Sequence, residues 1–459
     1  MYDFLRTAER MLATPSVTSD GTAEIVDYVL RAVVPDLPGD SMVMAEPDGR
    51  DVNVLVVVPG KDDEQPLLLN SHLDTVPPGE PRAWTATGGD PFRPRLDGDR
   101  LVGLGSADAK LDWLCKAEAI RRSARAGVER PIYLLGTYGE ERGLIGARSF
   151  LESALASRPA AALVGEPTEC RLVTRHKGLL MARLGLVALS RELAQVALRV
   201  RVRRYAGRAS HSATPEHGDS AVLKALGDLA DETPVVAIRG GDAVNRVPAR
   251  CEVEVAISCN PRASGRAVGG STSEVHPMSP ALLMAARDFA GALLVLVEQA
   301  DGEGRGFEPP GTTANIGRIE GRGETLTLAF DVRPLPGSEM RVMRAKLEAI
   351  ASELEGSYAG VRASVVIERE NPALASAPPG LVDMALDAMR VVGLPRAVGA
   401  MAGCTEAGLY ADGGIPAVVF GAGQAAGNIH APNEWTSITQ LRRAVEFYTA
   451  FIEVYCGRQ

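Results

Sequence analysis

The sequence predicts an α/β protein with a mostly parallel sheet, helices on both faces, and an inserted α+β domain. Short apolar runs with the length of buried strands alternate with stretches whose apolar residues recur at helical spacing, which favours a parallel sheet covered on both faces. The middle of the chain changes to partly alternating, Arg-rich segments and helices. The length of 459 residues also exceeds what one hydrophobic core supports, so at least two domains are expected.

The amino-terminal part of the chain carries the first elements of the predicted sheet. An amphipathic helix opens the sequence and ends in a Pro-containing loop. Strands are predicted next, and polar residues appear only where each strand would end; they are Val52–Val58, Leu67–Asn70, Pro131–Thr137 and Ala160–Val164. Helices are predicted at Ala109–Ala124 and Leu144–Leu155.

The character of the sequence changes after residue 177. Partial alternation in Leu179–Tyr205 suggests a strand with one apolar and one charged face. The elements expected next are helices at Asp219–Asp231, Ser279–Gln299 and Glu339–Leu354, and strand pairs at Val235–Ser258 and Asn315–Arg333. The two strand pairs resemble each other loosely, which hints at a duplicated lobe. We therefore predict helices on one face of an antiparallel sheet.

The α/β pattern resumes near Asn371. A helix at Leu381–Val392, a strand at Pro416–Gly421 and a helix at Ile438–Val454 complete it. The predicted domains are residues 1–177 and 371–459, which together form one discontinuous domain, and residues 178–370, which are inserted into it.

Composition narrows the classes of function. Hydrophobic content of 46% and charged content of 23% are ordinary for a soluble globular protein, and a net charge of -9 argues against nucleic acid as a partner. Six cysteines without a CxxC pair suit reduced thiols. We expect no signal peptide and no membrane-spanning apolar run, so cytoplasmic residence is the default expectation.

Candidate chemical groups follow the predicted strands of the α/β domain. They are His72, Asp108, the pair Glu140 and Glu141, Glu166 and His430. Ligands collect at the carboxyl ends of strands in open α/β sheets, and imidazole with carboxylate suits zinc, cobalt or manganese. Two ions roughly 3.5–4 Å apart, bridged by one carboxylate and one water, would use five ligands and leave one carboxylate as general base.

Each candidate also has an ordinary structural explanation when it is taken alone. His72 suits a loop, Asp108 suits a helix N-cap, and Glu166 before Pro167 suits a turn. The acidic pair at 140 and 141 suits a solvated helix start, where negative charge is favoured. Asp74, two residues after His72, has the spacing of a carboxylate that orients a metal-binding imidazole.

Eight motifs together carry a specific resemblance. In order they are HLDTVP, GSADAK, YGEERGLIGA, GEPTE, TRHKG, SHSATPEHG, NRVP and IHAPNEW. The chain resembles the dinuclear zinc amidohydrolases and peptidases that include acetylornithine deacetylase, succinyl-diaminopimelate desuccinylase and glutamate carboxypeptidase. The resemblance implies a zinc-binding catalytic domain at residues 1–177 and 371–459, and a lid or dimerisation domain at residues 178–370.

The resemblance also implies roles for individual residues. His72 and Glu166 would bind one zinc, Glu141 and His430 the other, and Asp108 would bridge the two. Glu140 would be the general base and Asp74 would orient His72. These assignments make two divalent ions the expected cofactors, with zinc as the first candidate and cobalt or manganese as alternatives.

The inserted domain supplies three further candidates by the same resemblance. His211 would donate to the oxyanion of the tetrahedral intermediate, unless it is a hydrated loop histidine. Asn245 and Arg333 match positions that contact substrate in relatives, and an Arg can hold a carboxylate bidentately. Arg333 has an equally good alternative, which is an ion pair with Asp331.

Two segments depart from the family pattern. The Gly-rich continuation after the Asp-x-Lys motif is replaced by Leu111-Asp112-Trp113, and Thr405-Glu406 replaces the usual Thr-Asp pair. The inserted domain also looks longer than a single lobe. A duplicated lobe would make the chain a monomer resembling some dipeptidases, whereas a single lobe would favour a homodimer, with His211 acting in cis or in trans accordingly.

The function predicted from the sequence is metal-dependent hydrolysis of the amide bond of a small N-acyl amino acid by a metal-bridging water. A dipeptidase or carboxypeptidase acting at the same site is the alternative within enzymes. A catalytically silent binding or assembly protein is the alternative outside them. Serine hydrolases and single-zinc proteases are disfavoured, because the chain has neither GxSxG nor HExxH.

Overall fold

The computed structural model describes residues 3–123, 127–155, 159–189, 198–229, 233–258 and 276–457. The chain separates into two compact units, the first comprising Met1–His176 with Leu374–Gln459 and the second Lys177–Ala373. The expected inserted segment, residues 178–370, falls within the second unit. Predictions for the helix ends at Ala124 and Asp231, for residues 190–197 and for Cys259 lie outside the described residues.

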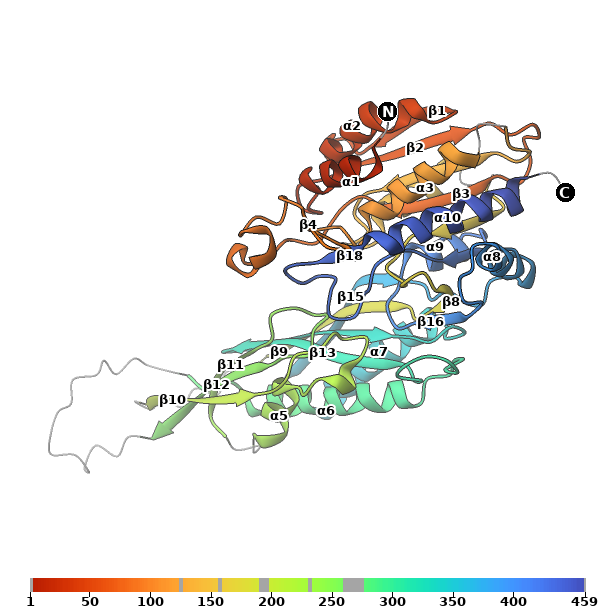
Figure 1. Cartoon of the computed structure of the whole chain (residues 1–459). Coiled ribbons are helices and arrows are strands. Elements are labelled where there is room, and N and C mark those ends of the chain that lie inside the picture. The colour runs from red at the N-terminus through yellow and green to blue at the C-terminus, as the bar shows by residue number, and fades with distance from the viewer. Residues whose placement is uncertain are drawn as a thin grey trace. The chain divides into compact units, whose positions relative to one another are not determined.

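The first unit is built on an eight-stranded sheet (Figure 1). In spatial order its strands are β1 (Asp40–Ala45), β2 (Val52–Val58), β6 (Ile132–Thr137), β3 (Leu67–His72), β7 (Ala161–Val164), β17 (Ala417–Val419), β8 (Leu172–His176) and β16 (Val398–Met401). Pairing is parallel from β6 through β3 and β7 to β17, and between β8 and β16. It is antiparallel for β1 with β2, β2 with β6 and β17 with β8.

Helices cover both faces of this sheet, which confirms the predicted fold class. One face packs against α1 (Phe4–Ala13), α2 (Ala23–Ala32), α3 (Lys110–Ser123), α8 (Pro379–Val391) and α10 (Ile438–Cys456). The other face packs against α4 (Ile145–Leu151) and α9 (Glu406–Asp412). Neighbouring strand residues divide between the two cores: Leu67 and Leu69 enter the first, and Leu68 enters the second. The strands are apolar on both faces for this reason.

A small three-stranded sheet lies beside the large one in the first unit. It contains β18 (Trp435–Ser437), β5 (Arg100–Val102) and β4 (Arg95–Asp97) in that order. Short 3-10 helices occupy the connections of the first unit at Val34–Asp36, Pro81–Ala83 and Thr85–Thr87. Because β18 pairs with β5, the segment that carries His430 is drawn toward the loop that carries Asp108.

The second unit is an antiparallel sheet with helices on one face, as the sequence predicts (Figure 1). In spatial order its strands are β10 (Leu198–Ala206), β12 (Arg250–Ser258), β11 (Val235–Gly240), β13 (Thr313–Arg322), β14 (Thr325–Arg333), β9 (Leu179–Ala188) and β15 (Val361–Asn371). The helices are α5 (Ala221–Asp228), α6 (Pro280–Glu298) and α7 (Met340–Ser357), with a 3-10 turn at Pro215–His217.

The two similar strand pairs adjoin within this one sheet. The pair β11 and β12 meets the pair β13 and β14 through antiparallel pairing of β11 with β13. Both pairs contribute side chains to a single hydrophobic core, together with all three helices. In the described part of the second unit, the loose repeat therefore corresponds to neighbouring hairpins of one sheet.

Helix α6 differs from the expectation that no apolar run approaches membrane-spanning length. By length and composition it is apolar enough to cross a membrane. Its buried residues, including Leu282, Phe289 and Leu293, belong to the core of the second unit. Helix α6 is apolar because a broad face of the helix packs against the sheet and is shielded from water.

Candidate metal centre

Three neighbouring parallel strands bring the first candidate residues to one edge of the sheet. Strand β3 lies between β6 and β7 and ends at His72. Glu140 and Glu141 follow the end of β6, and Glu166 follows the end of β7. Parallel strands in register place their carboxyl ends together, so side chains separated by about a hundred residues meet here.

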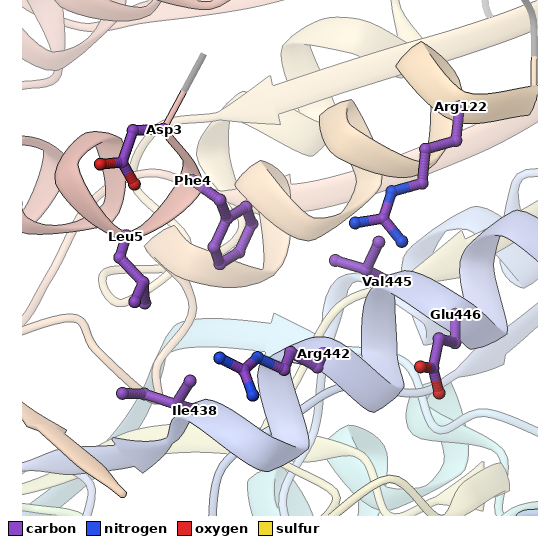
Figure 2. Close-up of a pocket in the computed structure, with 8 residues that line it drawn as sticks. All are labelled: Asp3, Phe4, Leu5, Arg122, Ile438, Arg442, Val445 and Glu446. Carbon is purple, nitrogen blue, oxygen red and sulfur yellow. The ribbon is translucent and has the colours of Figure 1, made fainter. Parts of the chain in front are cut away.

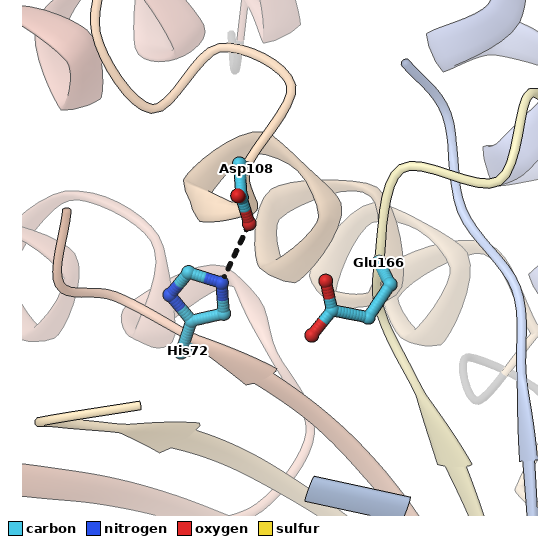
Figure 3. Close-up of side chains that lie close together, drawn as sticks. All are labelled: His72, Asp108 and Glu166. Atoms are coloured by element: carbon cyan, nitrogen blue, oxygen red, sulfur yellow. Dashed lines mark hydrogen bonds and ion pairs between the residues drawn. The ribbon is translucent and has the colours of Figure 1, made fainter. Parts of the chain in front are cut away.

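The candidate ligands form two groups that share Asp108. One group is His72, Asp108 and Glu166 (Figure 3), and the other is Asp108, Glu141 and His430; within each group the ligand atoms lie within 4.8 Å of one another. Oδ1 of Asp108 lies 2.9 Å from Nε2 of His72, and Oδ2 lies 3.2 Å from Nε2 of His430. Each carboxylate oxygen of Asp108 thus faces a different imidazole.

A contact with the main chain determines which ring nitrogen of His72 carries a proton. Nδ1 of His72 lies 3.0 Å from the carbonyl oxygen of Asp74. A carbonyl oxygen only accepts, so Nδ1 carries a proton, and when the ring loses its second proton the lone pair appears at Nε2. The ring nitrogen that faces Asp108 and Glu166 is therefore the one prepared to bind a metal.

The carboxylate of Asp74 has a different principal contact from the one expected. It accepts the backbone N–H of Glu140 at 3.1 Å and that of Glu141 at 3.4 Å. Its Oδ1 is 3.5 Å from Nδ1 of His72, farther than the Asp74 carbonyl oxygen. Asp74 therefore orients His72 chiefly through its main chain, and its side chain ties the segment after β6 to the end of β3.

The electrostatics of the cluster favour cations. Burial and neighbouring carboxylates raise the pKa values of Glu166 and Glu140 well above normal, although the charge of His72 opposes both shifts. Burial disfavours protonation of His430, yet the charge of Glu141 and the hydrogen bond to Asp108 raise its pKa to about 12. Repulsion among buried carboxylates is relieved by divalent cations, so the donor set fits two such ions.

Glu434 is a buried acid near the centre to which the motif analysis gave no role. Its carboxylate accepts backbone N–H groups of Gly105, Ala107 and Asp108 at 3.2, 2.8 and 3.1 Å. Burial and the charge of Asp108 raise the pKa of Glu434 to about 8. Glu434 holds the loop that presents Asp108, and its position after His430 in IHAPNEW was the available signal.

Glu406, the residue that departs from the usual Thr-Asp pair, is completely buried. It begins α9, whose first turn is capped by Thr405 accepting the N–H of Ala407. Burial raises the pKa of Glu406 to about 7, while the charge of His72 opposes the shift. Compared with Asp, the longer Glu406 side chain moves this carboxyl group by one methylene, and its pKa responds to His72 and Asp74 of the cluster.

The remaining predicted residues belong to the second unit. Nδ1 of His211 accepts the backbone N–H of Ala213 at 3.1 Å, and the segment pairs with Arg246 through a backbone bridge. Arg333 is 5% exposed, and its Nε lies 3.0 Å from Asp331. This is the ion pair that the sequence left open as the alternative for Arg333.

A separate cavity of about 320 Å³ opens in the first unit among α1, α3 and α10 (Figure 2). It is lined by Asp3, Phe4, Leu5, Arg122, Ile438, Arg442, Val445 and Glu446. None of these residues was predicted to take part in catalysis or metal binding.

The sheet topology and the paired ligand groups fit a metal-dependent hydrolase of amide bonds. The profile of Peptidase family M20/M25/M40 matches residues 68–454, and the chain belongs to this family. A curated relative, acetylornithine deacetylase of Klebsiella pneumoniae (strain 342), is 30% identical over 281 residues, which are 55% of this chain and 67% of the relative. The resemblance inferred from the eight motifs is thereby confirmed.

Solved structures show the same fold over nearly the whole chain. Aminoacylhistidine dipeptidase from Vibrio alginolyticus aligns with a TM-score of 0.65 and 18% identity, covering 98% of this chain and 96% of that one. The YxeP protein of Bacillus subtilis, described as a dinuclear metal-binding peptidase of family M20, aligns with a TM-score of 0.55 and 11% identity over 98% and 96%. The family thus includes dinuclear metal-binding members.

Proposed function

We propose that the chain hydrolyses the amide bond of a small N-acyl amino acid. The observation that carries the proposal is the sharing of Asp108 by two ligand groups, with a further buried carboxyl group, Glu140, that interacts electrostatically with His72, Glu141 and Asp108. The family and the curated deacetylase relative support hydrolysis of this bond type. A dipeptidase or carboxypeptidase would use the same groups, so the substrate class is a matter for experiment.

The ions assigned to the centre are zinc, with cobalt or manganese as alternatives. His72 and Glu166 would hold one ion, Glu141 and His430 would hold the other, and Asp108 would serve both. Bound divalent ions supply Lewis acidity, which activates water and polarises the scissile carbonyl. A donor set of two imidazoles and several carboxylates suits zinc better than magnesium or calcium, which favour oxygen ligands.

Glu140 is the proposed general base. It neighbours the ligand Glu141 but belongs to neither ligand group, and its backbone N–H is held by Asp74. In this role Glu140 takes a proton from the attacking water and then delivers it to the leaving amine. One carboxyl group thus serves both proton transfers.

His211 is the proposed donor to the oxyanion. Because Ala213 donates its N–H to Nδ1 of His211, the neutral ring carries its own proton on Nε2. An Nε2–H group can donate to the negative oxygen that develops in the transition state. The hydrogen bond from Ala213 therefore favours the tautomer that this role requires.

Asn245 and Arg333 are the proposed contacts for the free carboxylate of the substrate. Asn245 is exposed, and its backbone oxygen accepts the N–H of Ser212, which places it beside the His211 segment. Arg333 is committed to Asp331, so its guanidinium is available to a substrate only through its remaining N–H groups. Asn245 is the stronger of these two assignments.

A substrate panel tests the proposal. The purified chain, loaded in turn with zinc, cobalt and manganese, is assayed with acetyl, succinyl and aminoacyl derivatives of the same amino acids. We expect hydrolysis of an acyl derivative, with zinc among the active metals. Exclusive hydrolysis of aminoacyl derivatives would instead establish a dipeptidase. Metal-loaded protein that hydrolyses none of them would indicate a binding or assembly role.

We further propose a cytoplasmic homodimer that associates through the second unit. The single sheet and core of that unit support a single lobe, and five described cysteines carry free thiols. Light scattering measures the mass directly. A monomer over the working concentration range would contradict the dimer.

A further inference from the structure

Four polar side chains meet in the interior of the first unit, behind the edge that carries the metal ligands. They are Ser71 on β3, Asp112 and Lys116 on α3, and Tyr448 on α10, and none is more than 4% exposed. We call this set the Asp112 cluster. Asp112 is one of the residues at which the sequence departs from the Gly-rich family pattern.

The hydrogen bonds of the Asp112 cluster are complete. Nζ of Lys116 uses its three N–H groups on Asp112 Oδ2, the carbonyl oxygen of Asn70 and Ser71 Oγ, at 2.7, 2.5 and 2.9 Å. Asp112 Oδ2 also accepts the hydroxyl of Ser71 at 2.8 Å, and Oδ1 accepts that of Tyr448 at 2.5 Å. Every member therefore has a fixed orientation.

Stability alone is a weak reason for such a cluster. Removing two charges from water costs several kcal/mol each, roughly, and well-packed apolar residues of similar volume often serve a core as well or better. What a satisfied buried ion pair does provide is a single geometry for the segments that it touches. The contacts of the Asp112 cluster show which segments these are.

The Asp112 cluster touches the peptides that precede two metal ligands. Asn70 and Ser71, which Lys116 binds, come immediately before His72. Gly165, immediately before Glu166, donates its N–H to the Asn70 carbonyl oxygen at 2.8 Å. A Cβ atom at Gly165 would lie 1.8 Å from Oδ2 of Asp112 and 2.6 Å from Nζ of Lys116, so the chain passes directly over the ion pair.

Gly421, which follows strand β17, is a second glycine that lies close to the Asp112 cluster. A Cβ atom there would lie 2.9 Å from Oδ1 of Asp112 and 2.4 Å from the carbonyl oxygen of Glu166. Both close approaches require glycine, because any side chain would displace the cluster or the Glu166 segment. His72 and Glu166, the two ligands next to the Asp112 cluster, are the pair assigned to one ion.

We infer that the Asp112 cluster positions His72 and Glu166 and so sets the metal affinity of the position they form with Asp108, in preference to the position formed by Glu141 and His430. The inference rests on the metal assignments of the proposed function. The members of the Asp112 cluster are positioning residues, since they contact the segments that present the ligands. The expected effect is selective loss of one ion.

Single substitutions would leave one charge buried without its partner, so the main test variant is D112N/K116M, which removes both charges at similar volume. The matched control is Glu118→Gln, a change on the same helix that breaks a buried carboxylate's ion pairs with Arg121 and Arg122. Circular dichroism and thermal melting verify that each variant is folded. Tyr448→Phe, which removes one hydroxyl, is the milder variant if D112N/K116M does not fold.

Metal binding is measured on metal-free protein by calorimetric titration with zinc, with bound metal counted by mass spectrometry. To separate the two positions, the cluster change is also made with Glu141→Ala, which leaves the His72 position intact, and with Glu166→Ala, which leaves the His430 position intact. We expect zinc affinity at the His72 position to fall about 10- to 100-fold, as for other groups that orient ligands. Affinity at the His430 position and in the Glu118→Gln control should stay unchanged.

Equal weakening of both positions, or unchanged affinity at the His72 position in folded protein, would overturn the inference. A failure of the metal assignments looks different, because the unmodified chain would then bind no pair of ions, and a failure of the proposed hydrolysis alone would leave both ions bound without turnover. The unmodified chain therefore serves as the reference that separates the two outcomes.

Discussion

At the scale of single residues, Glu140 offers the sharpest test of the chemistry. Glu140→Gln keeps the volume and the backbone N–H that Asp74 accepts, but it removes the group that takes the proton. We expect metal content to be unchanged and kcat to fall by at least about 100-fold. Steady-state kinetics with metal analysis measures both, and Glu141→Gln, which alters a ligand, should instead lose metal. Near-normal turnover by Glu140→Gln would remove Glu140 from the role of base.

Asp74 gives a second prediction at this scale. Asp74→Asn preserves the carbonyl oxygen that fixes His72, but the new amide group can accept only on one side and opposes an N–H on the other. An unsatisfied buried group costs about 1–3 kcal/mol, so the segment bearing Glu140 and Glu141 should loosen. We expect weaker zinc binding and lower turnover in a folded protein. Calorimetric titration and kinetics check this, and unchanged values would show that Asp74 is a plain loop residue.

The sequence could predict the residues whose role depends on residue type and local order. His72, Asp108, Glu141, Glu166 and His430 each follow a strand or begin a helix, and the structure brings them together. Glu434 was not predicted because it binds main-chain N–H groups more than three hundred positions earlier, and backbone donors leave no mark on the sequence. The contact of the Asp74 carboxylate with main-chain N–H groups was not predicted, for the same reason.

At the scale of elements, strand β14 holds the segment of the proposed oxyanion donor. Ser212, next to His211, donates to Asp331 at 2.5 Å, and Arg333 contacts Ser212 Oγ at 3.2 Å. Asp331 and Arg333 both lie on β14, so a rigid strand fixes the segment by side chains. Elements with saturated backbone pairing hold functional groups more accurately than loops do.

Ser212→Ala tests this support. The change removes the Ser212 hydroxyl that both Asp331 and Arg333 contact. We expect kcat to fall about tenfold while the zinc content stays constant. The effect should nearly vanish in a His211→Ala background, because both changes act through one group. Ser220→Ala, which removes the N-cap of α5 in the same unit, is the control and should cost stability without lowering kcat. Additive losses from Ser212→Ala and His211→Ala would contradict the coupling.

Element prediction succeeded where an apolar run was strong and failed at strands without one, including the long strand β15. The runs at β2, β3, β6 and β7 are apolar on both faces and were predicted from that property. Strand β16 has four residues, all partly or fully exposed. Strand β8 is mostly buried, but its sequence LVTRH is more than half polar and so contains no apolar run. Their pairing at the edge of the sheet depends on a partner more than two hundred residues away.

At the scale of the whole molecule, the division into two units places the proposed metal ligands in the first and His211 in the second. The five proposed ligands come from both halves of the discontinuous first unit, since His430 follows the inserted second unit in sequence. Metal binding by these residues would therefore join segments that the insertion separates along the chain. Its consequences should appear in the folding stability of the first unit.

Metal removal is predicted to destabilise the first unit selectively. Without cations, the carboxylates of Asp108, Glu141 and Glu166 are buried together, and the raised pKa values of Glu141 and Glu166 show that their charged forms are disfavoured there. Zinc that binds only the folded state stabilises it by about 2.7 kcal/mol when its concentration is a hundred times Kd. Chelated protein should therefore lose activity and melt at a lower temperature in the transition of the first unit, and zinc should restore both.

The second unit supplies the internal control for this experiment. Its core is separate and none of the proposed ligands lies in it, so its melting transition should not respond to chelation. Differential scanning calorimetry of chelated and zinc-loaded protein resolves the two transitions, and Glu166→Ala should reduce the zinc-dependent shift. A zinc-dependent shift confined to the second unit, or none in either, would contradict the placement of the ions at the end of β3, because only ligands of the folded first unit are expected to bind them.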